Sequence, residues 1–305
     1  MKGEFCLKIS MDLHTHSIFS DGEKTPREIV LKAKEEGIDV IALTDHNTFD
    51  GVSEFRDACV EVGQKGLVGI ELSTRYPLVM SSREIHILGL YPLDTDFDSP
   101  VFEKFKAYLG RQTIMKAKQN DKIVSALAAD FPEVSVDGFH DFVSDVKHVN
   151  RAHIAMYLVK IGIAKDIKDA FSNFIGFECK YYVRKDTINT GAGISYILKT
   201  GGIPIVAHMG EYSHITDRKE FYEYLMIRDI RGFEVFHPSN SPEIRDDLIQ
   251  FCKDHDLMIT AGSDYHGKSK PQQIGEVLGH GKEISCEDTK LIDDYFKKYI
   301  EVLFR

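Results

Sequence analysis

Two histidines with one residue between them are the first residues in this sequence whose types and spacing could serve chemistry. The segment DLHTHSIFSDG, residues 12–22, contains His14 and His16. Side chains two positions apart on a strand point to the same face, so these two imidazoles would face one side together. Asp264 and His266 repeat the spacing in GSDYHG near the other end of the chain. Neutral imidazole and carboxylate groups suit Zn²⁺, Mn²⁺ or Fe²⁺, so the two segments predict a metal site.

Short apolar runs lead into, or carry, most of the other candidate residues. Each run is brief, rich in β-branched residues and bounded by Gly or Asp, which is typical of buried strands. In chain order the runs are LKISMDL, IDVIAL, LVGI, IHILGLY, GIPIVA, GFEVF and LMITAGS. The polar residues that they lead into or carry are His14, His46, Glu71, His86, His208, His237 and Asp264. Because parallel α/β folds bind ligands at the rim formed by the carboxyl ends of their strands, we expect these side chains to converge on one site.

Helical segments lie between most of the predicted strands. The first begins with a capping box, Thr25-Pro-Arg-Glu28, and ends at Gly37. Further helices are predicted over 52–62, 191–200, 219–227 and 242–255. Strands that alternate with helices indicate a parallel α/β architecture, here with seven strands. The link between the third and fourth strands is too short for a helix.

The alternation stops between about residues 99 and 188. Residues 101–129 and 151–175 read as consecutive helices without strands between them. We therefore predict a catalytic barrel formed by residues 1–98 and 189–305, interrupted by a helical insertion, 99–188, that contributes to the substrate pocket.

Each motif alone has an ordinary explanation. Asp45 and His46 could cap a turn, Glu71 could pair with Arg75, and His86 could be a core histidine. The set is different, because buried histidines and carboxylates at strand ends are costly unless they are paired or bind a metal. The remaining histidines lie in helical or loop contexts and are predicted to have no site role: His140, His148, His214, His255 and His280.

Composition limits the classes of partner and the compartment. The net charge of −10 makes the chain a poor binder of long nucleic acid, which needs a basic surface. The five cysteines are scattered and odd in number, as expected for reduced thiols. No apolar run resembles a signal peptide or is long enough to cross a bilayer, so we expect no membrane association and a cytoplasmic location. The oligomeric state is left open.

With these motifs the sequence resembles the polymerase and histidinol phosphatase (PHP) family of metal-dependent phosphoesterases, in particular its stand-alone enzymes acting on nucleotide or oligonucleotide phosphates. The similarity covers about residues 10–105 and 190–280 and extends into the insertion through NRAHIAMYLVKIGIAKDIKDAF. The resemblance implies a distorted seven-stranded (β/α) barrel that holds two or three divalent ions, Mn, Zn or Fe. By the family pattern, His14, His16, Glu71 and Asp264 would hold one ion, Glu71 would bridge to a second ion held by His86 and His208, and Asp21, His46 and His266 would hold a third.

The chemistry that the resemblance implies is hydrolysis of a small phosphate ester by a hydroxide that bridges two metals. The expected substrate is a nucleotide, such as a 3′,5′-bisphosphate, or the end of a short oligoribonucleotide. His237 and Asp45 are the catalytic candidates: the third metal or His237 would assist the leaving oxygen, and Asp45 would orient a metal ligand. Arg151, His153 and Arg184 are predicted to bind a second phosphate or the nucleotide.

Three other functions remain open at this point. Within the same chemistry, the chain could be a cyclic-phosphate phosphodiesterase or a histidinol-phosphate phosphatase, although the insertion suggests a larger substrate than histidinol phosphate. Amidohydrolases also begin with HxH at a strand end and cleave C–N bonds. They usually close with a lone aspartate, whereas this chain closes with SDYH. A non-enzymatic interaction module is disfavoured because no expected ligand position is missing.

Overall fold

The computed structural model describes residues 10–79, 83–146, 149–177, 179–183, 187–278, 287–288, 290–292 and 294–296, and the statements below refer to these residues. Arg184, a predicted substrate contact, lies outside them, as do His148 and His280.

Seven strands form one sheet in which each strand pairs with its neighbours in chain order. They are β1 (Met11–Asp12), β2 (Val40–Leu43), β3 (Lys65–Thr74), β4 (Ile85–Tyr91), β5 (Ile203–Val206), β6 (Gly232–Phe236) and β7 (Met258–Ala261). The first and last strands meet where the Leu13 N–H donates to the Ala261 carbonyl over 2.9 Å. A bridge between Thr15 and Tyr265 continues this pairing beyond the strands. The predicted seven-stranded barrel is confirmed, and it is nearly closed.

The fourth strand runs against the direction of the others. β4 pairs antiparallel with both β3 and β5, whereas the remaining neighbours pair in parallel. The sheet of the predicted α/β barrel is therefore mixed at this strand and parallel elsewhere. The physical reason is the short connection after β3, because a parallel return needs a longer crossover. The reversal places the start of β4, and with it His86, at the rim where β3 and β5 end.

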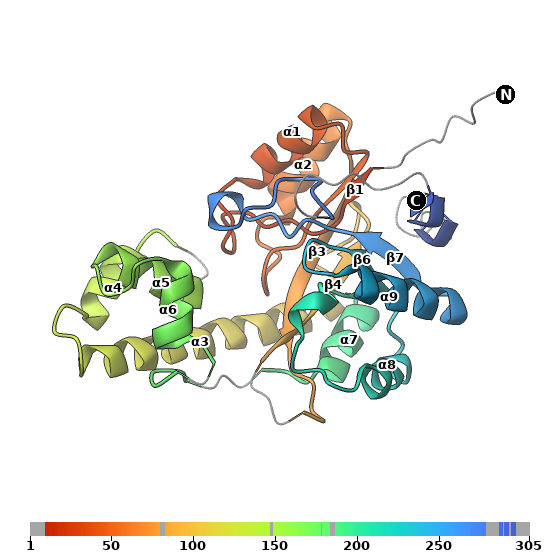
Figure 1. Cartoon of the computed structure of the whole chain (residues 1–305). Helices are drawn as coiled ribbons and strands as arrows, with labels where there is room; N and C mark the ends of the chain where they lie inside the picture. Colours follow the sequence, from red (N-terminus) through yellow and green to blue (C-terminus); the bar gives the residue numbers. More distant parts are fainter. Residues whose placement is uncertain are drawn as a thin grey trace.

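The helices of the barrel lie close to their predicted positions. They are α1 (Pro26–Glu35), α2 (Val52–Val62), α7 (Thr190–Lys199), α8 (Arg218–Met226) and α9 (Pro242–His255), and they lie around the outside of the sheet (Figure 1). In the capping box of α1, the Glu28 N–H donates to Thr25 Oγ1 over 3.2 Å, and the Thr25 N–H donates to Glu28 Oε2 over 2.8 Å. The apolar faces of the five helices complete a core with Ile41, Leu67 and Ile205 of the strands.

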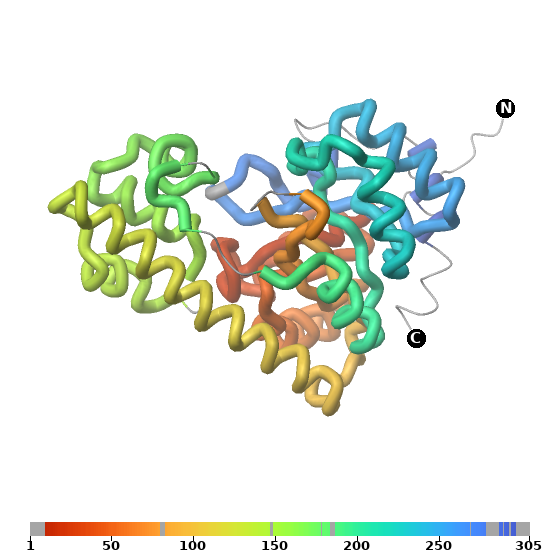
Figure 2. Tube along the Cα trace, turned by 90° about the horizontal axis from the view of Figure 1, so that it is seen from below, coloured from red at the N-terminus to blue at the C-terminus, as the bar shows by residue number. Residues whose placement is uncertain are grey.

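The insertion begins with one long helix that leads away from the barrel. α3 (Pro100–Ala128) has 29 residues, a length of about 43 Å at the usual helical rise. At its far end lie α4 (Val136–Phe142), α5 (Arg151–Lys160), α6 (Ile167–Ala170) and a π-helical turn, Phe171–Ile175, to one side of the barrel (Figures 1 and 2).

These helices pack around an apolar cluster of their own, separate from that of the barrel, which includes Ile123, Phe139 and Leu158. Two cores agree with the predicted insertion, whose boundaries at 99 and 188 stay a prediction. Among the described helices, none is both long and apolar enough to span a membrane.

Candidate metal centre

The carboxylate of Glu71 lies at the centre of a cluster of histidines at the rim of the barrel. Glu71 is buried within β3, which extends further than the four-residue run seen in the sequence. Its oxygen Oε1 lies 2.8 Å from His208 Nε2 and 2.5 Å from His86 Nδ1. Its oxygen Oε2 lies 3.0 Å from His46 Nδ1, 3.1 Å from His16 Nε2 and 3.2 Å from His14 Nε2. Strand ends far apart in sequence thus deliver five imidazoles to one carboxylate.

Asp264 closes the cluster on the side of β7. Its Oδ1 lies 3.2 Å from His16 Nε2, 3.3 Å from His266 Nδ1 and 3.6 Å from His14 Nε2, while Lys270 forms an ion pair with Oδ2. The backbone of Asp264 has a φ of 55°, in the left-handed region that costs a non-glycine residue energy. Such local strain is common at functional sites, where the surrounding structure holds the backbone in place.

Asp21 gathers a further group next to this cluster. Its Oδ1 lies 3.1 Å from His266 Nε2 and 3.8 Å from His16 Nδ1, and its Oδ2 lies 3.7 Å from His46 Nε2. The side-chain amide of Asn150, from the insertion, donates to Oδ2 over 2.8 Å. The Asp21 group therefore contains residues from the barrel and touches the insertion.

These residues fit metal ions. Three groups have donor atoms within 4.8 Å of one another: His14, His16, Glu71 and Asp264; His16, Asp21, His46 and His266; and His46, Glu71 and His86. Within the described chain, buried atoms without a hydrogen-bond partner include His14 Nε2, His16 Nε2, Asp21 Oδ1, His46 Nδ1, Glu71 Oε2, His86 Nδ1 and Asp264 Oδ1. Unsatisfied buried donors and acceptors are costly, and divalent cations would satisfy this nitrogen and oxygen set.

The electrostatics of the cluster show how strongly a positive charge is favoured there. Burial would raise the pKa of Glu71, but His46, His86 and His14 hold that pKa well below its usual value. Burial would lower the pKa of His86, yet the Glu71 carboxylate outweighs burial and raises it to about 10. For His16, Asp264 and Glu71 likewise overcome burial and raise the pKa to about 9. Protons on His16 and His86 would therefore pair with these carboxylates in the absence of metal, whereas burial lowers the pKa of His46, and metal binding would displace the protons.

Glu234, which sequence reasoning missed, supports two of the candidate ligands from behind. Its Oε1 lies 3.0 Å from His14 Nδ1, and its Oε2 accepts the His208 N–H over 2.8 Å. Partners of this kind fix the orientation of a ligating histidine. The signal was present in the sequence, since Glu234 is the one ionisable residue of the apolar run GFEVF. A Cβ atom at Gly262 would lie 2.1 Å from Glu234 Oε1, so a glycine is required beside it.

Asp45 and Asp12 hold the two loops that carry the paired ligands. Asp45 accepts the Ser17 N–H (2.7 Å), the Ser17 hydroxyl (2.6 Å) and the Ser20 hydroxyl (2.5 Å). The Ser20 oxygen lies 3.4 Å from His16 Nδ1, so the hydrogen bonds of Asp45 lead to the candidate ligand His16 through Ser20. Asp12, which was missed, accepts the N–H (2.9 Å) and hydroxyl (2.6 Å) of Ser263. Both carboxylates position loops.

His237 lies beside the cluster but belongs to none of the three groups among the described residues. Its ring centroid is 5.4 Å from that of His208. Its Nδ1 accepts the Ser239 N–H over 3.1 Å, and its Nε2 has no hydrogen-bond partner in the described chain. Accepting at Nδ1 leaves the proton of the neutral ring on Nε2.

A cavity of about 380 Å³ joins the candidate metal centre to the insertion. Its lining includes Asp21, His46, His86, Glu84 and Glu211 on the barrel side, and Lys116, Gln119, Asn150, Arg151 and Tyr182 on the insertion side. The guanidinium of Arg151 lies over the ring of Tyr182, 5.3 Å from its centroid. Lys116 and Asn150 were missed because nothing local in α3, or before α5, marks them as facing the barrel.

His153 does not line this cavity, although it was predicted to contact substrate. It is the third residue of α5, and its Nδ1 accepts the Asn150 N–H over 3.1 Å as half of a capping box. The structure thus gives the ring a local role in starting the helix. Of the three predicted substrate contacts, only Arg151 is placed at the cavity, since Arg184 lies outside the described residues.

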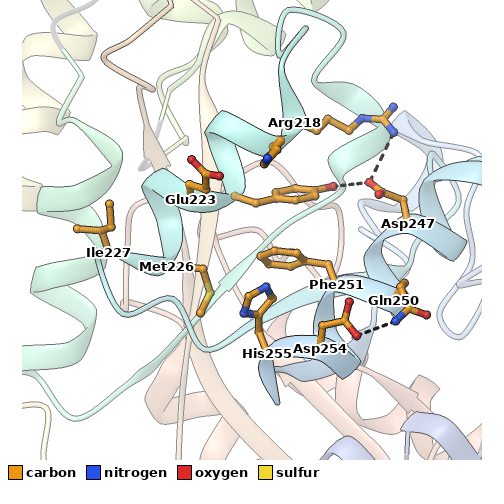
Figure 3. Close-up of a pocket in the computed structure, with 11 residues that line it drawn as sticks. Arg218, Glu223, Met226, Ile227, Asp247, Gln250, Phe251, Asp254 and His255 are labelled. Carbon is orange, nitrogen blue, oxygen red and sulfur yellow. Dashed lines mark hydrogen bonds and ion pairs between the residues drawn. The ribbon is translucent and has the colours of Figure 1, made fainter.

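A larger cavity, of about 710 Å³, lies between α8 and α9 (Figure 3). Tyr222, Met226 and Phe251 line it, and the Tyr222 hydroxyl donates to Asp247 over 2.9 Å. None of the residues of the three metal-capable groups is in its lining. The smaller cavity is therefore the one at which chemistry is expected.

Comparisons with known proteins agree with this geometry. A family model described as the PHP domain matches residues 12–304. A 5′-3′ exoribonuclease of Haemophilus influenzae is 32% identical over 260 residues, 84% of this chain and 89% of its own. A 3′,5′-nucleoside bisphosphate phosphatase of Chromobacterium violaceum is 26% identical over 282 residues, 90% of this chain and 92% of its own. A solved structure from Bifidobacterium adolescentis, assigned as a metal-dependent phosphoesterase, has a TM-score of 0.76 at 29% identity and covers 93% of this chain and 96% of its own.

Proposed function

Because the chain belongs to the PHP family and is a metal-dependent hydrolase of phosphoric esters, we propose that it acts on nucleotides, as a 3′,5′-bisphosphate phosphatase or at the end of a short oligoribonucleotide. The observation that carries this proposal is the cavity that connects the candidate metal centre to Arg151 and Lys116 of the insertion. A substrate with one phosphate at the metals and a second negative group a few ångströms away would satisfy both ends.

The proposed ligand sets follow the converging atoms. His14, His16, Glu71 and Asp264 would hold one ion; Glu71, His86 and His208 a second; and Asp21, His46 and His266 a third. When bound, closely spaced divalent ions supply Lewis-acid chemistry: they lower the pKa of a water and neutralise phosphate oxygens. The donor set fits Mn²⁺, Zn²⁺ and Fe²⁺ alike.

The protein's own residues orient the substrate and supply a proton-bearing group. Arg151 and Lys116 would attract the phosphate that is not being cleaved, because both line the insertion side of the cavity. His237 would donate a hydrogen bond from Nε2 to the leaving oxygen. Burial lowers the pKa of His237 to about 4, which keeps the ring neutral, so it is proposed as a donor and not as a strong acid.

The two cations on the insertion side of the cavity also separate the leading substrate from an alternative, whereas Glu84 and Glu211 line its barrel side. Histidinol phosphate carries its ammonium group on the carbon next to the phosphorylated CH2 group and an imidazole at its far end, so it offers no second anionic group to Arg151 and Lys116. A second phosphate would be attracted there. The location is proposed to be the cytoplasm.

The test is phosphate release from a substrate panel. Mn²⁺-loaded protein would be assayed with adenosine 3′,5′-bisphosphate, 5′-AMP, 3′-AMP, cyclic nucleotides and histidinol phosphate. We expect kcat/KM for the bisphosphate to exceed that for either monophosphate at least about tenfold, as for a charge-assisted contact of 1.5 kcal/mol or more. Release from none of the nucleotides by fully metal-loaded protein would overturn the proposal.

Arg151→Gln supplies the matched test of the insertion side. It should lower kcat/KM for the bisphosphate and leave that for the monophosphates nearly unchanged. Arg218→Gln removes the same group from the cavity between α8 and α9 and should change neither. Equal losses on both substrate types would show that Arg151 does not contact the second phosphate.

A further inference from the structure

A row of two aromatic side chains, with an arginine at each end, begins in the cavity beside the metal centre and extends beyond its lining. The Arg151 guanidinium lies 5.3 Å from the centroid of the Tyr182 ring, and the Arg83 guanidinium lies 5.5 Å from that of Phe177. The rings of Phe177 and Tyr182 meet edge to face, with centroids 5.8 Å apart. We refer to these four residues as the arginine–aromatic row. Arg151 and Tyr182 line the cavity, whereas Phe177 and Arg83 lie beyond its lining.

The row connects two parts of the chain. Arg151 is the first residue of α5, and Phe177 and Tyr182 follow the π-helical turn of the insertion. Arg83 precedes β4 of the barrel, and its Nη1 donates to the hydroxyl of Ser213 over 2.8 Å. Phe177 is a large apolar side chain that remains 36% exposed. An exposed ring that contacts a guanidinium group on one side and a second aromatic ring on the other is an unusual feature for a chain of net charge −10, and packing of the insertion core does not explain it.

Aromatic rings and guanidinium planes next to a nucleotide site are suited to unpaired bases. Bases of single-stranded RNA stack on aromatic and arginine side chains, and arginine also neutralises the phosphates between them. Base-paired RNA offers no free base faces to such a row. The cavity of about 380 Å³ is at the small end of ligand pockets, so a second nucleotide would extend past its lining toward Phe177.

We propose that the arginine–aromatic row binds the second nucleotide of a single-stranded RNA whose terminal nucleotide occupies the cavity. The inference rests on the proposed nucleotide function and narrows the substrate class to short single-stranded oligoribonucleotides. Tyr182 and Arg151, which line the cavity, then serve the bisphosphate and the longer substrates alike, whereas Phe177 and Arg83 serve only substrates of two nucleotides or more. A row that merely fastens the insertion to the barrel would treat all lengths alike.

The experiment compares the activity of each variant on substrates of different lengths. For Phe177→Ala we expect kcat/KM to fall about 5- to 50-fold on 5′-phosphorylated di- and trinucleotides, the effect of losing one stacked base. Activity on adenosine 3′,5′-bisphosphate should stay within about twofold. Phe177→Tyr should keep wild-type activity on the longer substrates, because it retains an aromatic ring. Phe177→Leu, which has an apolar side chain but no ring, should lose activity as Phe177→Ala does. Arg83→Gln should lower activity on the longer substrates alone.

Ile114→Ala is the matched control, since Ile114 is also an exposed apolar residue of the insertion and lies outside the row. It should leave all lengths unchanged. Equal loss on every length, or none on any, would overturn the proposal. Binding of a fluorescein-labelled trinucleotide and mononucleotide, followed by anisotropy, separates this result from failure of the proposed function. In this binding assay Phe177→Ala should lose affinity for the trinucleotide and not for the mononucleotide, even if neither ligand is hydrolysed. Unchanged affinity for the trinucleotide would also overturn the proposal.

Discussion

The side-chain amide of Asn150 donates a hydrogen bond of 2.8 Å to Oδ2 of Asp21 and so joins the insertion to a candidate metal group. The orientation of this amide is fixed because its oxygen accepts the Ala152 N–H over 2.9 Å at the start of α5. Asp21 is left with Oδ1, which lies 3.1 Å from His266 Nε2 and has no hydrogen-bond partner in the described chain. The position of the insertion thus determines which oxygen of Asp21 is available to a cation.

Asn150→Ser should weaken metal binding at Asp21 without unfolding α5. Serine still caps a helix, but it cannot reach Asp21. We expect affinity for the ion held by Asp21, His46 and His266 to fall about 10- to 100-fold, as for loss of a partner behind a ligand. Equilibrium dialysis with metal analysis measures it. Asn189→Ser, the same change at the start of α7, where Asn189 accepts the Ala192 N–H, should leave affinity unchanged. Wild-type affinity in Asn150→Ser would show that the contact only seats the insertion.

Glu234→Gln should reduce metal affinity although Glu234 is not in any of the three groups that could hold a metal ion. One side-chain oxygen faces His14, and the other accepts the His208 N–H, so an amide would present an N–H where an acceptor is needed. We expect a loss of about 10- to 100-fold for the ions held by His14 and His208, measured by calorimetric titration. The surface substitution Glu133→Gln is the control. Unchanged titration curves in Glu234→Gln would contradict the supporting role.

Gly262→Ala should destabilise the fold as well as the metal centre. The added Cβ would lie 2.1 Å from Glu234 Oε1 and 2.5 Å from the Cβ of His14. We expect the free energy of unfolding in urea to fall by about 1–3 kcal/mol, as for overpacking of a core. Gly110→Ala, in the middle of α3 with no atom within 4 Å of the new Cβ, should be neutral or gain up to about 1 kcal/mol. A stable Gly262→Ala variant with full metal content would mean that the site tolerates displacement of Glu234.

The metal-free protein should lose stability as the pH rises. The pKa values of His16 and His86 are raised to about 9 and about 10, so the folded state holds protons that the unfolded state releases near the ordinary histidine pKa. This stabilisation is fully present below the unfolded pKa and is lost as the pH rises through 9 to 10. Urea denaturation of chelator-treated protein between pH 6.5 and 10 should show a falling midpoint, with a smaller fall in metal-loaded protein. A midpoint of metal-free protein that is flat or rises over this range would contradict the electrostatic account.

Local patterns in the sequence predicted the elements, and tertiary contacts explain what they missed. The capping box at Thr25 and the apolar runs before His14, His208 and Asp264 depend on neighbouring residues, so they could be read directly. The reversal of β4 was not predicted, although the short link between the third and fourth strands was the signal for it, because a parallel return needs a longer crossover. Asn150 and Glu234 act on residues 129 and 220 positions away, and no spacing rule connects them. The role of His153 Nδ1 at the start of α5 was not predicted, and its contact with substrate stays a prediction.

The central claim is that Glu71 gathers divalent ions that the protein needs to cleave a nucleotide phosphate. The most direct measurement is metal content per chain together with phosphate release from adenosine 3′,5′-bisphosphate, in wild type and in Glu71→Gln. We expect two or three ions per chain in the wild type. Glu71→Gln, which keeps the shape of the side chain, should lose at least one ion, with phosphate release reduced at least about a hundredfold. A Glu71→Gln protein with the full ion count and wild-type phosphate release would contradict it.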